Sequence, residues 1–344
     1  MNKIINLIVA MAALTFCFSC NNEWEDEQFA HYVGFKAPIN ADGCTTIYVK
    51  YKAPTAEEPN PTVHYKLPLV VSGSTLHSGN IAAKVELDPD SLEVLNIKNI
   101  GERRQDIWYR DLSDNTLHDG KDRVITEFPT TVNIPAGQSV ALLDLEFDLS
   151  DLNQSHRWIL PLRVAENQPG YTANTRKHYN NALLHVVPFN DYSGTFVSSA
   201  MQGRPVINGS VNVNAIPYTV SEKTLYATGD KTAFFYAGGI DHTYKQRDAY
   251  RVDIEFGEAG SLKWTAANPE LKFSVKPGSD SYITPAEPDP LKPYLVRKSV
   301  IIQATYYMTD KTGGVPVDYE FKGVMTMQRT INTQIPDEDQ AIQW

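Results

Sequence analysis

Two short stretches of the chain combine aromatic rings with hydrogen-bonding side chains, a combination that suits carbohydrate binding. The first is Trp108-Tyr109, in a polar segment that runs from 101 to 122. The second is Tyr244 with three polar neighbours, Asp241, His242 and Arg247. A ring can stack on the apolar face of a sugar while amide, carboxylate and guanidinium groups pair with its hydroxyls. Because most aromatic rings of a β-protein lie in its core, packing is the alternative role for both stretches.

Catalytic motifs are not recognisable in the sequence. It contains no Gly-x-Ser-x-Gly nucleophile elbow, no His-Glu-x-x-His zinc pair, no phosphate-binding glycine loop and no EF-hand spacing. The densest His/Asp groupings, Asp241-His242 with Asp248 and His118-Asp119, are interpreted as solvated loops rather than metal sites. We therefore expect no cofactor and no catalysis. A glycosidase is an open alternative, since two carboxylates suffice for that reaction and the chain has 41 acidic residues.

The N-terminus has the parts of a secretory signal that ends at a cysteine. Lys3 supplies a positive charge, an apolar run follows, and the small Ser19 precedes Cys20. The apolar run spans about 15 residues, fewer than the roughly 20 that a membrane-spanning helix needs. We predict a signal peptide over 1–19, cleavage before Cys20, and lipid on that cysteine as the attachment to the membrane. The alternative is an ordinary secretory signal in which Cys20 is incidental.

Residues 20–29 are predicted to form an acidic tether. Four acids lie within the stretch 23–27, and such a self-repelling segment does not pack into a core. Of the three cysteines, Cys17 leaves with the signal and Cys20 carries lipid. Cys44 then has no disulfide partner, and we expect it to be a buried or half-buried strand residue.

The formal net charge of −10 limits the classes of partner. An acidic chain without basic clusters is a poor candidate for nucleic acid or for direct electrostatic adhesion to anionic lipid. Neutral or cationic ligands agree better with this overall charge.

Short apolar runs separated by turn residues dominate the chain from Tyr32 onward and predict an all-β protein. One short helix is expected after Asp88-Pro89, with Leu92, Val94, Leu95 and Ile97 as its apolar residues. Turn residues from 188 to 194 mark a boundary. We predict an immunoglobulin-like β-sandwich over 30–189 and an antiparallel β-domain over 190–344. The second domain is either a calycin-like barrel or another β-sandwich, and it ends in a strand pair at 299–308 and 318–328.

Several strand edges and turns resemble a known lipoprotein module. They are the acidic start, the stretches at 32–38, 65–74 and 134–137, Trp158-Ile159-Leu160-Pro161-Leu162, and 190–195. Together they resemble a domain of unknown function that is abundant in Bacteroidetes lipoproteins encoded beside starch-utilisation-system-like transporters. The ending at 331–341 resembles the C-terminal β-domain that accompanies this module. In some relatives the module precedes a family 18 glycoside hydrolase, whose Asp-rich signature this chain lacks.

The resemblance implies a surface protein that holds glycans. Our hypothesis is a lipid-anchored outer-membrane protein, expected to face the cell exterior, which binds a polysaccharide or glycoprotein glycan near an outer-membrane importer. The alternative is an adhesion or scaffold lipoprotein that binds protein partners. The sequence leaves the glycan, the domain that carries the site, the membrane face and the oligomeric state undecided.

Overall fold

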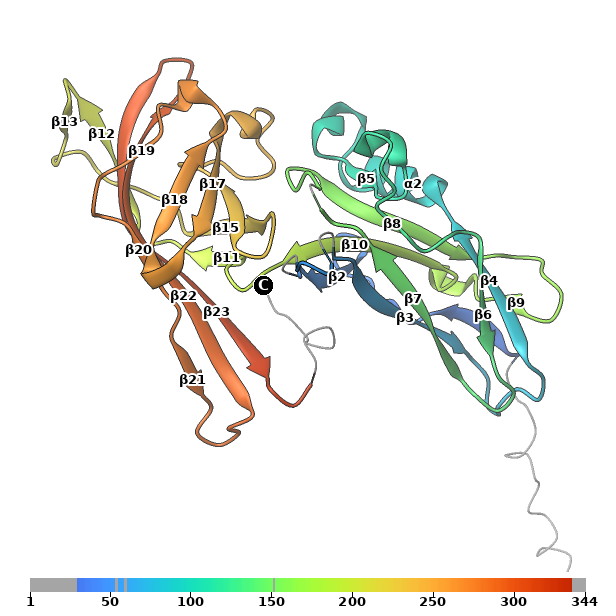
Figure 1. Cartoon of the computed structure of the whole chain (residues 1–344). Helices are drawn as coiled ribbons and strands as arrows, with labels where there is room; N and C mark the ends of the chain where they lie inside the picture. Colours follow the sequence, from blue (N-terminus) through green and yellow to red (C-terminus); the bar gives the residue numbers. More distant parts are fainter. Residues whose placement is uncertain (1–29, 53–54, 59–60, 151, 336–344) are drawn as a thin grey trace, which may run out of the picture.

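The protein is built mostly from β-strands, as a computed structural model of the chain shows (Figure 1). The structure describes residues 30–52, 55–58, 61–150 and 152–335. The predicted lipidation residue Cys20, the signal peptide and the acidic tether all lie outside these residues. Within the described residues, no helix is both long and apolar enough to cross a membrane.

Described residues 30–189, here called the N-terminal unit, form two sheets. The four-stranded sheet has the order β7-β3-β1-β9 and the larger sheet has the order β2-β10-β8-β4-β6, with β5 paired to β8. The strands of the first sheet are β1 (Tyr32–Phe35), β3 (Val63–Val71), β7 (Val140–Phe147) and β9 (Thr172–Ala173). Those of the second are β2 (Thr45–Lys50), β4 (Ile81–Leu87), β5 (Tyr109–Asp111), β6 (Thr130–Ile134), β8 (Arg157–Val164) and β10 (Asn181–Phe189).

A shared apolar core joins these two sheets. Burial alternates along β2, where Ile47 and Val49 point inward and Tyr48 points outward. This alternation is the period-two pattern of a strand with one buried face. The inward residues of both sheets, such as Leu67 of β3 and Leu162 of β8, pack in one cluster.

The outward face of the larger sheet is covered at one end by an insertion between β4 and β6. It contains α2 (Pro89–Asn99), η2 (Glu102–Ile107) and η3 (Asn115–His118). Leu92 and Leu95 of α2 pack with Cys44 and Tyr109 against this face. The predicted helix and the burial of Cys44 are confirmed, but Val94 and Ile97 point to solvent.

Residues 190–335, the C-terminal unit, form a single curled sheet with a core of its own. Its dominant element is the hairpin of β22 (Leu295–Asp310) and β23 (Val317–Asn332), which confirms and extends the predicted terminal pair. The other strands are β11 (Gly194–Val197), β12 (Gln202–Ile207), β13 (Ser210–Val211), β14 (Tyr218–Thr219), β15 (Glu222–Ala227), β16 (Thr232–Tyr236), β17 (Arg251–Phe256), β18 (Leu262–Ala266), β19 (Ser274–Val275), β20 (Ser281–Ile283) and β21 (Ala286–Pro288). Short 3-10 helices complete the described chain: η4 (Arg176–His178), η5 (Arg247–Tyr250), η6 (Glu258–Gly260) and η7 (Pro269–Leu271).

The mostly-β prediction is therefore confirmed, with two curled assemblies and few helices. The finer assignments, an immunoglobulin-like sandwich and a calycin-like barrel, stay predictions. The sequence pattern over 211–219 predicts one continuous strand, but residues 212–217 form a turn between β13 and β14, where the Asn212 side chain accepts a hydrogen bond from the Asn214 backbone.

The two units lie side by side (Figure 1), and the segment that connects them is hydrogen-bonded to the C-terminal unit. Asn190, in the connection between β10 and β11, donates to the carbonyls of Gly229 and Thr232 at 2.7 and 2.8 Å. Arg329 of β23 in turn donates to the carbonyls of Asn190 and Ser193 at 3.0 and 2.6 Å. The connection is thereby fixed to the C-terminal sheet.

Strand β7 offers a test of the alternating core. Leu145 is fully buried, whereas Leu142 on the same strand is 55% exposed. We expect Leu145→Ala to lower the free energy of unfolding by about 2–5 kcal/mol, because it leaves a cavity. Leu142→Ala should change it by no more than about 0.5 kcal/mol. Urea unfolding followed by tryptophan fluorescence measures both, and equal losses would contradict the assigned alternation.

Candidate functional site

A cavity of about 270 Å³ lies where the two units meet, and we call it the interface cleft. Its N-terminal wall includes Thr46, Tyr48, Tyr109, His156, Arg157 and His185. Its C-terminal wall includes Thr224, Tyr226, Tyr236 and His242. Aromatic rings and hydrogen-bonding groups from both units therefore face one space.

The N-terminal wall is the outward face of the larger sheet. Parallel pairing of β10 with β2 sets His185 beside Thr46 and Val187 beside Tyr48. Pairing of β5 with β8 sets Tyr109 beside Arg157. Residues at matched positions on neighbouring strands point to the same face, so strand register alone brings these side chains together.

Arg157 carries the positive charge of this wall. Its guanidinium carbon lies 4.0 Å from the centre of the Tyr109 ring, a cation–π contact. One of its amino groups donates to the carbonyl of Ile107. The ring of His185 meets the Tyr109 ring edge-on, with 5.3 Å between their centres. Among the described residues, no carboxylate forms an ion pair with Arg157.

Three histidines line the cleft with uncommitted ring nitrogens. Within the described part of the chain, His156, His185 and His242 have no hydrogen-bond partner for these nitrogens. Burial, reinforced by the positive charge of Arg110, lowers the pKa of His156 to about 4. Burial, reinforced by Arg157, also lowers the pKa of His185 to about 4. Both imidazoles are therefore neutral at pH 7, and each offers one donor and one acceptor.

The tyrosines of the cleft remain protonated. Burial raises the pKa of Tyr109, Tyr226 and Tyr236 above the ordinary range. Phenol groups can both donate and accept hydrogen bonds, as a ligand with many hydroxyls requires.

The structure brings the two sequence-predicted stretches to the same interface. Tyr109 and His242 line the cleft from opposite units. Arg247 is buried between the units, where it donates to the carbonyls of Asp106 at 3.0 Å and Ser155 at 3.2 Å. Its position is that of a structural link between the units.

The remaining predicted residues lie outside the cleft lining. Trp108 is half-buried and its indole N–H donates to the carbonyl of Gly101 at 3.0 Å. Asp241 and Tyr244 line a separate open depression next to Arg104. Burial opposes ionisation of Asp241, but hydrogen bonds from Thr243 outweigh it and lower the pKa of this carboxyl.

Arg157, His156 and His185 were not singled out from the sequence. The available signal was alternation: His185 is a polar residue between Leu184 and Val186 in an apolar run, which marks an outward position. The residues that cover this outward face belong to the C-terminal unit and lie about 40 residues or more further along the chain. The alternation within β10 therefore does not predict them.

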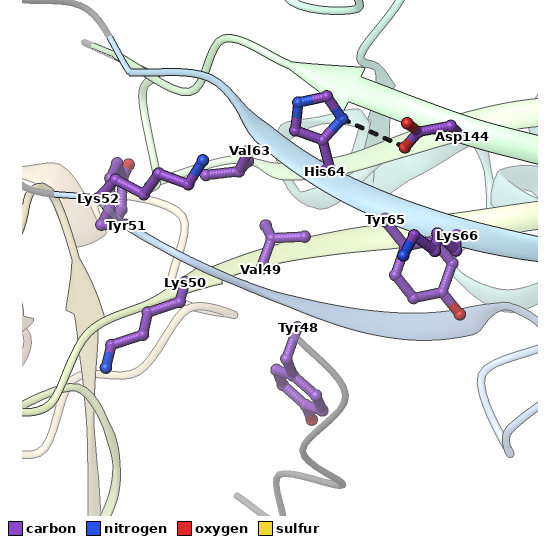
Figure 2. A pocket seen from close by; sticks show the side chains of 10 residues that line it. All are labelled: Tyr48, Val49, Lys50, Tyr51, Lys52, Val63, His64, Tyr65, Lys66 and Asp144. Carbon is purple, nitrogen blue, oxygen red and sulfur yellow. Dashed lines mark hydrogen bonds and ion pairs between the residues drawn. The ribbon is translucent and has the colours of Figure 1, made fainter. Parts of the chain in front are cut away.

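A second cleft, of about 640 Å³, opens between β2 and β3, and we call it the edge cleft. Figure 2 shows Tyr48 and Lys50 leaving β2 on one side, while Val49 points toward β3. Lys52 and Lys66 also line it, and His64 of β3 is hydrogen-bonded to Asp144 of β7 at 3.2 Å. Tyr48 lines both clefts.

A resident metal is not indicated by the described residues, because no group of three or more His, Cys, Asp or Glu side chains among them could hold an ion. The interface cleft is instead suited to hydrogen bonding and ring stacking.

The geometry defines a mostly-β protein with a polar, aromatic cleft between two units. Comparisons with known proteins give two family profiles that match successive parts of the chain. A family profile described as a domain of unknown function, DUF4973, matches residues 24–169. A second profile, described as a C-terminal domain, matches residues 180–326. The comparison with curated proteins gives no match.

Solved structures supply relatives along almost the whole chain. A multidomain protein including DUF1735 from Bacteroides ovatus is 37% identical, with a TM-score of 0.76 over 91% of this chain and 100% of that chain. An auxiliary nutrient binding protein from Bacteroides thetaiotaomicron is 32% identical, with a TM-score of 0.77 over 89% of this chain and 97% of that chain. A protein of unknown function from Bacteroides ovatus is 30% identical, with a TM-score of 0.74 over 90% and 95%.

The chain therefore belongs to the family that these Bacteroides proteins represent, with a DUF4973 domain in its first half. This result confirms the predicted resemblance at the level of the module and its bacterial group. The relative with a functional name is called a binding protein rather than an enzyme.

The pKa of His185 predicts a pH dependence of stability. In the unfolded chain this histidine has a pKa near 6.5, so between pH 6.5 and about 4 the unfolded state binds more protons than the folded state. The stability from the neutral buried ring is complete above pH 6.5 and is lost as the pH falls. Between pH 7 and pH 4.5 we expect wild type to lose about 2 kcal/mol more than His185→Gln. Parallel losses in urea unfolding would contradict this pKa.

The hydrogen bonds of Arg247 are expected to hold the two units together. Arg247→Ala removes donors from the carbonyls of Asp106 and Ser155, so we expect a loss of about 1–3 kcal/mol in unfolding free energy and faster proteolysis between the units. Arg297→Ala, at an exposed position on β22, is the control and should have an effect within about 0.5 kcal/mol. Calorimetry and limited proteolysis measure both, and identical behaviour would refute the linking role.

Proposed function

We propose that the protein is a non-catalytic glycan-binding lipoprotein of the bacterial surface, and that the glycan occupies the interface cleft. The observation that carries this proposal is the meeting of aromatic rings with uncommitted polar groups from both units in one cavity. The tyrosine rings of the lining supply apolar surface, while neutral His185 and Arg157 offer hydrogen bonds to hydroxyls. The name of the Bacteroides thetaiotaomicron relative, an auxiliary nutrient binding protein, supports the same assignment.

Binding without turnover agrees with the acid groups of the cleft. Glycoside hydrolysis ordinarily uses two carboxylates that flank the scissile bond. Among the described residues, Asp42 is the carboxylate that lines the interface cleft. Millimolar binding requires only about −4 kcal/mol, which a few hydrogen bonds and one stacked ring supply.

The sequence supports the proposed location of the protein at the bacterial surface. Lipid on Cys20 and the acidic tether over 20–29 place the protein on a membrane in this proposal, with its two units exposed to the exterior. A position beside an outer-membrane glycan importer follows from the resemblance to lipoproteins of polysaccharide-utilisation loci. Anchoring would raise the local concentration of the captured glycan at such an importer.

Binding is tested with one variant from each wall of the cleft. We expect His185→Ala and His242→Ala each to weaken glycan affinity about five- to thirtyfold, equivalent to about 1–2 kcal/mol per lost hydrogen bond. Tyr179→Ala, at a ring that is 46% exposed and outside the cleft, is the control. Affinity electrophoresis on a panel of plant and host glycans, followed by calorimetry on the best ligand, gives the measurement. If no glycan is retarded, or if the control behaves like the two cleft variants, the proposal fails.

A protein-binding role is the second candidate, and one surface favours it. Beside β12 and the β22–β23 turn, Ile207, Val213, Ile216 and Val315 are 55–92% exposed. Exposed apolar side chains gathered in one region often mark protein contacts. Reproducible capture of a protein partner that Ile216→Asp abolishes, with no retardation on glycan gels, would favour this role.

A further inference from the structure

The interface cleft and the edge cleft are connected along strand β2. Thr46 and Tyr48 line the interface cleft, and Tyr48 and Lys50 line the edge cleft. These three residues alternate on the outward face of β2, so successive side chains are about 6.6 Å apart. Tyr48 therefore stands where one cleft passes into the other.

The second observation concerns the charged side chains that line the two clefts. Among the described residues, the linings of the two clefts contain four cations, Arg157, Lys50, Lys52 and Lys66, and two carboxylates, Asp42 and Asp144. This local surplus of positive charge occurs in a chain whose net charge is −10. The sequence alone suggests neutral or cationic ligands, whereas tertiary structure gathers cations from separate strands.

These cations differ in how far they are already neutralised. Lys50 forms an ion pair with Asp191 at 3.2 Å, and Asp144 is engaged by His64. Arg157, Lys52 and Lys66 have no ion pair within the described residues. Arg157 is also half-buried and oriented over the Tyr109 ring, so its geometry is fixed before a ligand arrives.

We infer that the ligand is an acidic saccharide chain, which places a carboxylate at Arg157 in the interface cleft and continues past Tyr48 to Lys52 and Lys66 in the edge cleft. The inference rests on the proposed glycan binding and specifies its chemical class. A planar guanidinium suits a carboxylate because it can donate two parallel hydrogen bonds. The lysines, as flexible point charges at the open edge, suit repeated carboxylates of less defined position.

The overall negative charge does not prevent this contact. Interactions between exposed charges are screened beyond about 8–10 Å at physiological ionic strength, so the nearby cations dominate once the ligand is in place. Distant acids slow the approach of an anionic chain more than they weaken the bound state.

The test compares matched acidic and neutral ligands on the full chain. Hexamers of galacturonate and of mannuronate are titrated beside their methyl esters, which keep the sugar backbone and remove the charge. We expect at least one acid to bind tenfold or more tightly than its ester, and Arg157→Gln to reduce this ratio about tenfold. Lys52→Gln with Lys66→Gln should weaken the hexamer severalfold and leave the dimer of the same sugar unchanged. Lys322→Gln, at an exposed position on β23, is the control and should have no effect.

The outcomes separate the two levels of the proposal. Equal binding of acid and ester, or binding of neutral glycans alone, overturns the acidic class while the glycan function stands. An acid preference with equal affinities for dimer and hexamer, or one that the double lysine variant leaves intact, overturns the path along β2. Failure of every glycan in the wider panel removes the proposed function itself.

Discussion

The contact between the two units depends on side chains that donate to backbone carbonyls. Arg247 of the C-terminal unit donates to the carbonyls of Asp106 and Ser155 in the N-terminal unit. Asn190 and Arg329 fix the connecting segment to the C-terminal sheet through the carbonyls of Gly229, Thr232, Asn190 and Ser193. A buried guanidinium costs free energy unless its donors are paired, so the Arg247 side chain is stabilising only when the two units are in contact. The same contact brings Tyr226, Tyr236 and His242 in front of the N-terminal sheet and so creates the interface cleft.

The outward face of the larger sheet is consequently divided into zones with different chemistry. At one end the insertion carrying α2 packs Leu92 and Leu95 against Ile159, and this zone is apolar. Toward the other unit the outward positions are His185, Arg157 and Tyr48, which would be ordinary solvated residues on an isolated sheet. The C-terminal unit covers these residues only in part and leaves a partly desolvated space between the units. Burial in this space keeps His156 and His185 neutral and the tyrosines protonated.

The net charge of the chain does not describe the charge of the two clefts. The net charge of −10 describes the average surface, and it argues against nucleic acid or anionic lipid as partners. It says little about the space lined by Arg157, Lys52 and Lys66, because screening limits exposed charges to roughly a Debye length. The relatives from Bacteroides match almost the whole of this chain, so its mostly-β fold is shared within the family.

The sequence determined the elements whose signals are local. Short apolar runs predicted a mostly-β chain, the runs at 299–308 and 318–328 predicted the β22–β23 hairpin, and the Asp-Pro start at 88–89 predicted α2. It also placed Tyr109 and His242 among the candidate binding residues. Tertiary structure alone decided that these two face one another, that Arg247 links the units, and that Arg157 and His185 line the same space. The physical reason is the separation in sequence between the residues that interact. Strands and turns depend on neighbouring residues, whereas the cleft depends on the register of β2, β8 and β10 and on the packing of a second unit far along the chain.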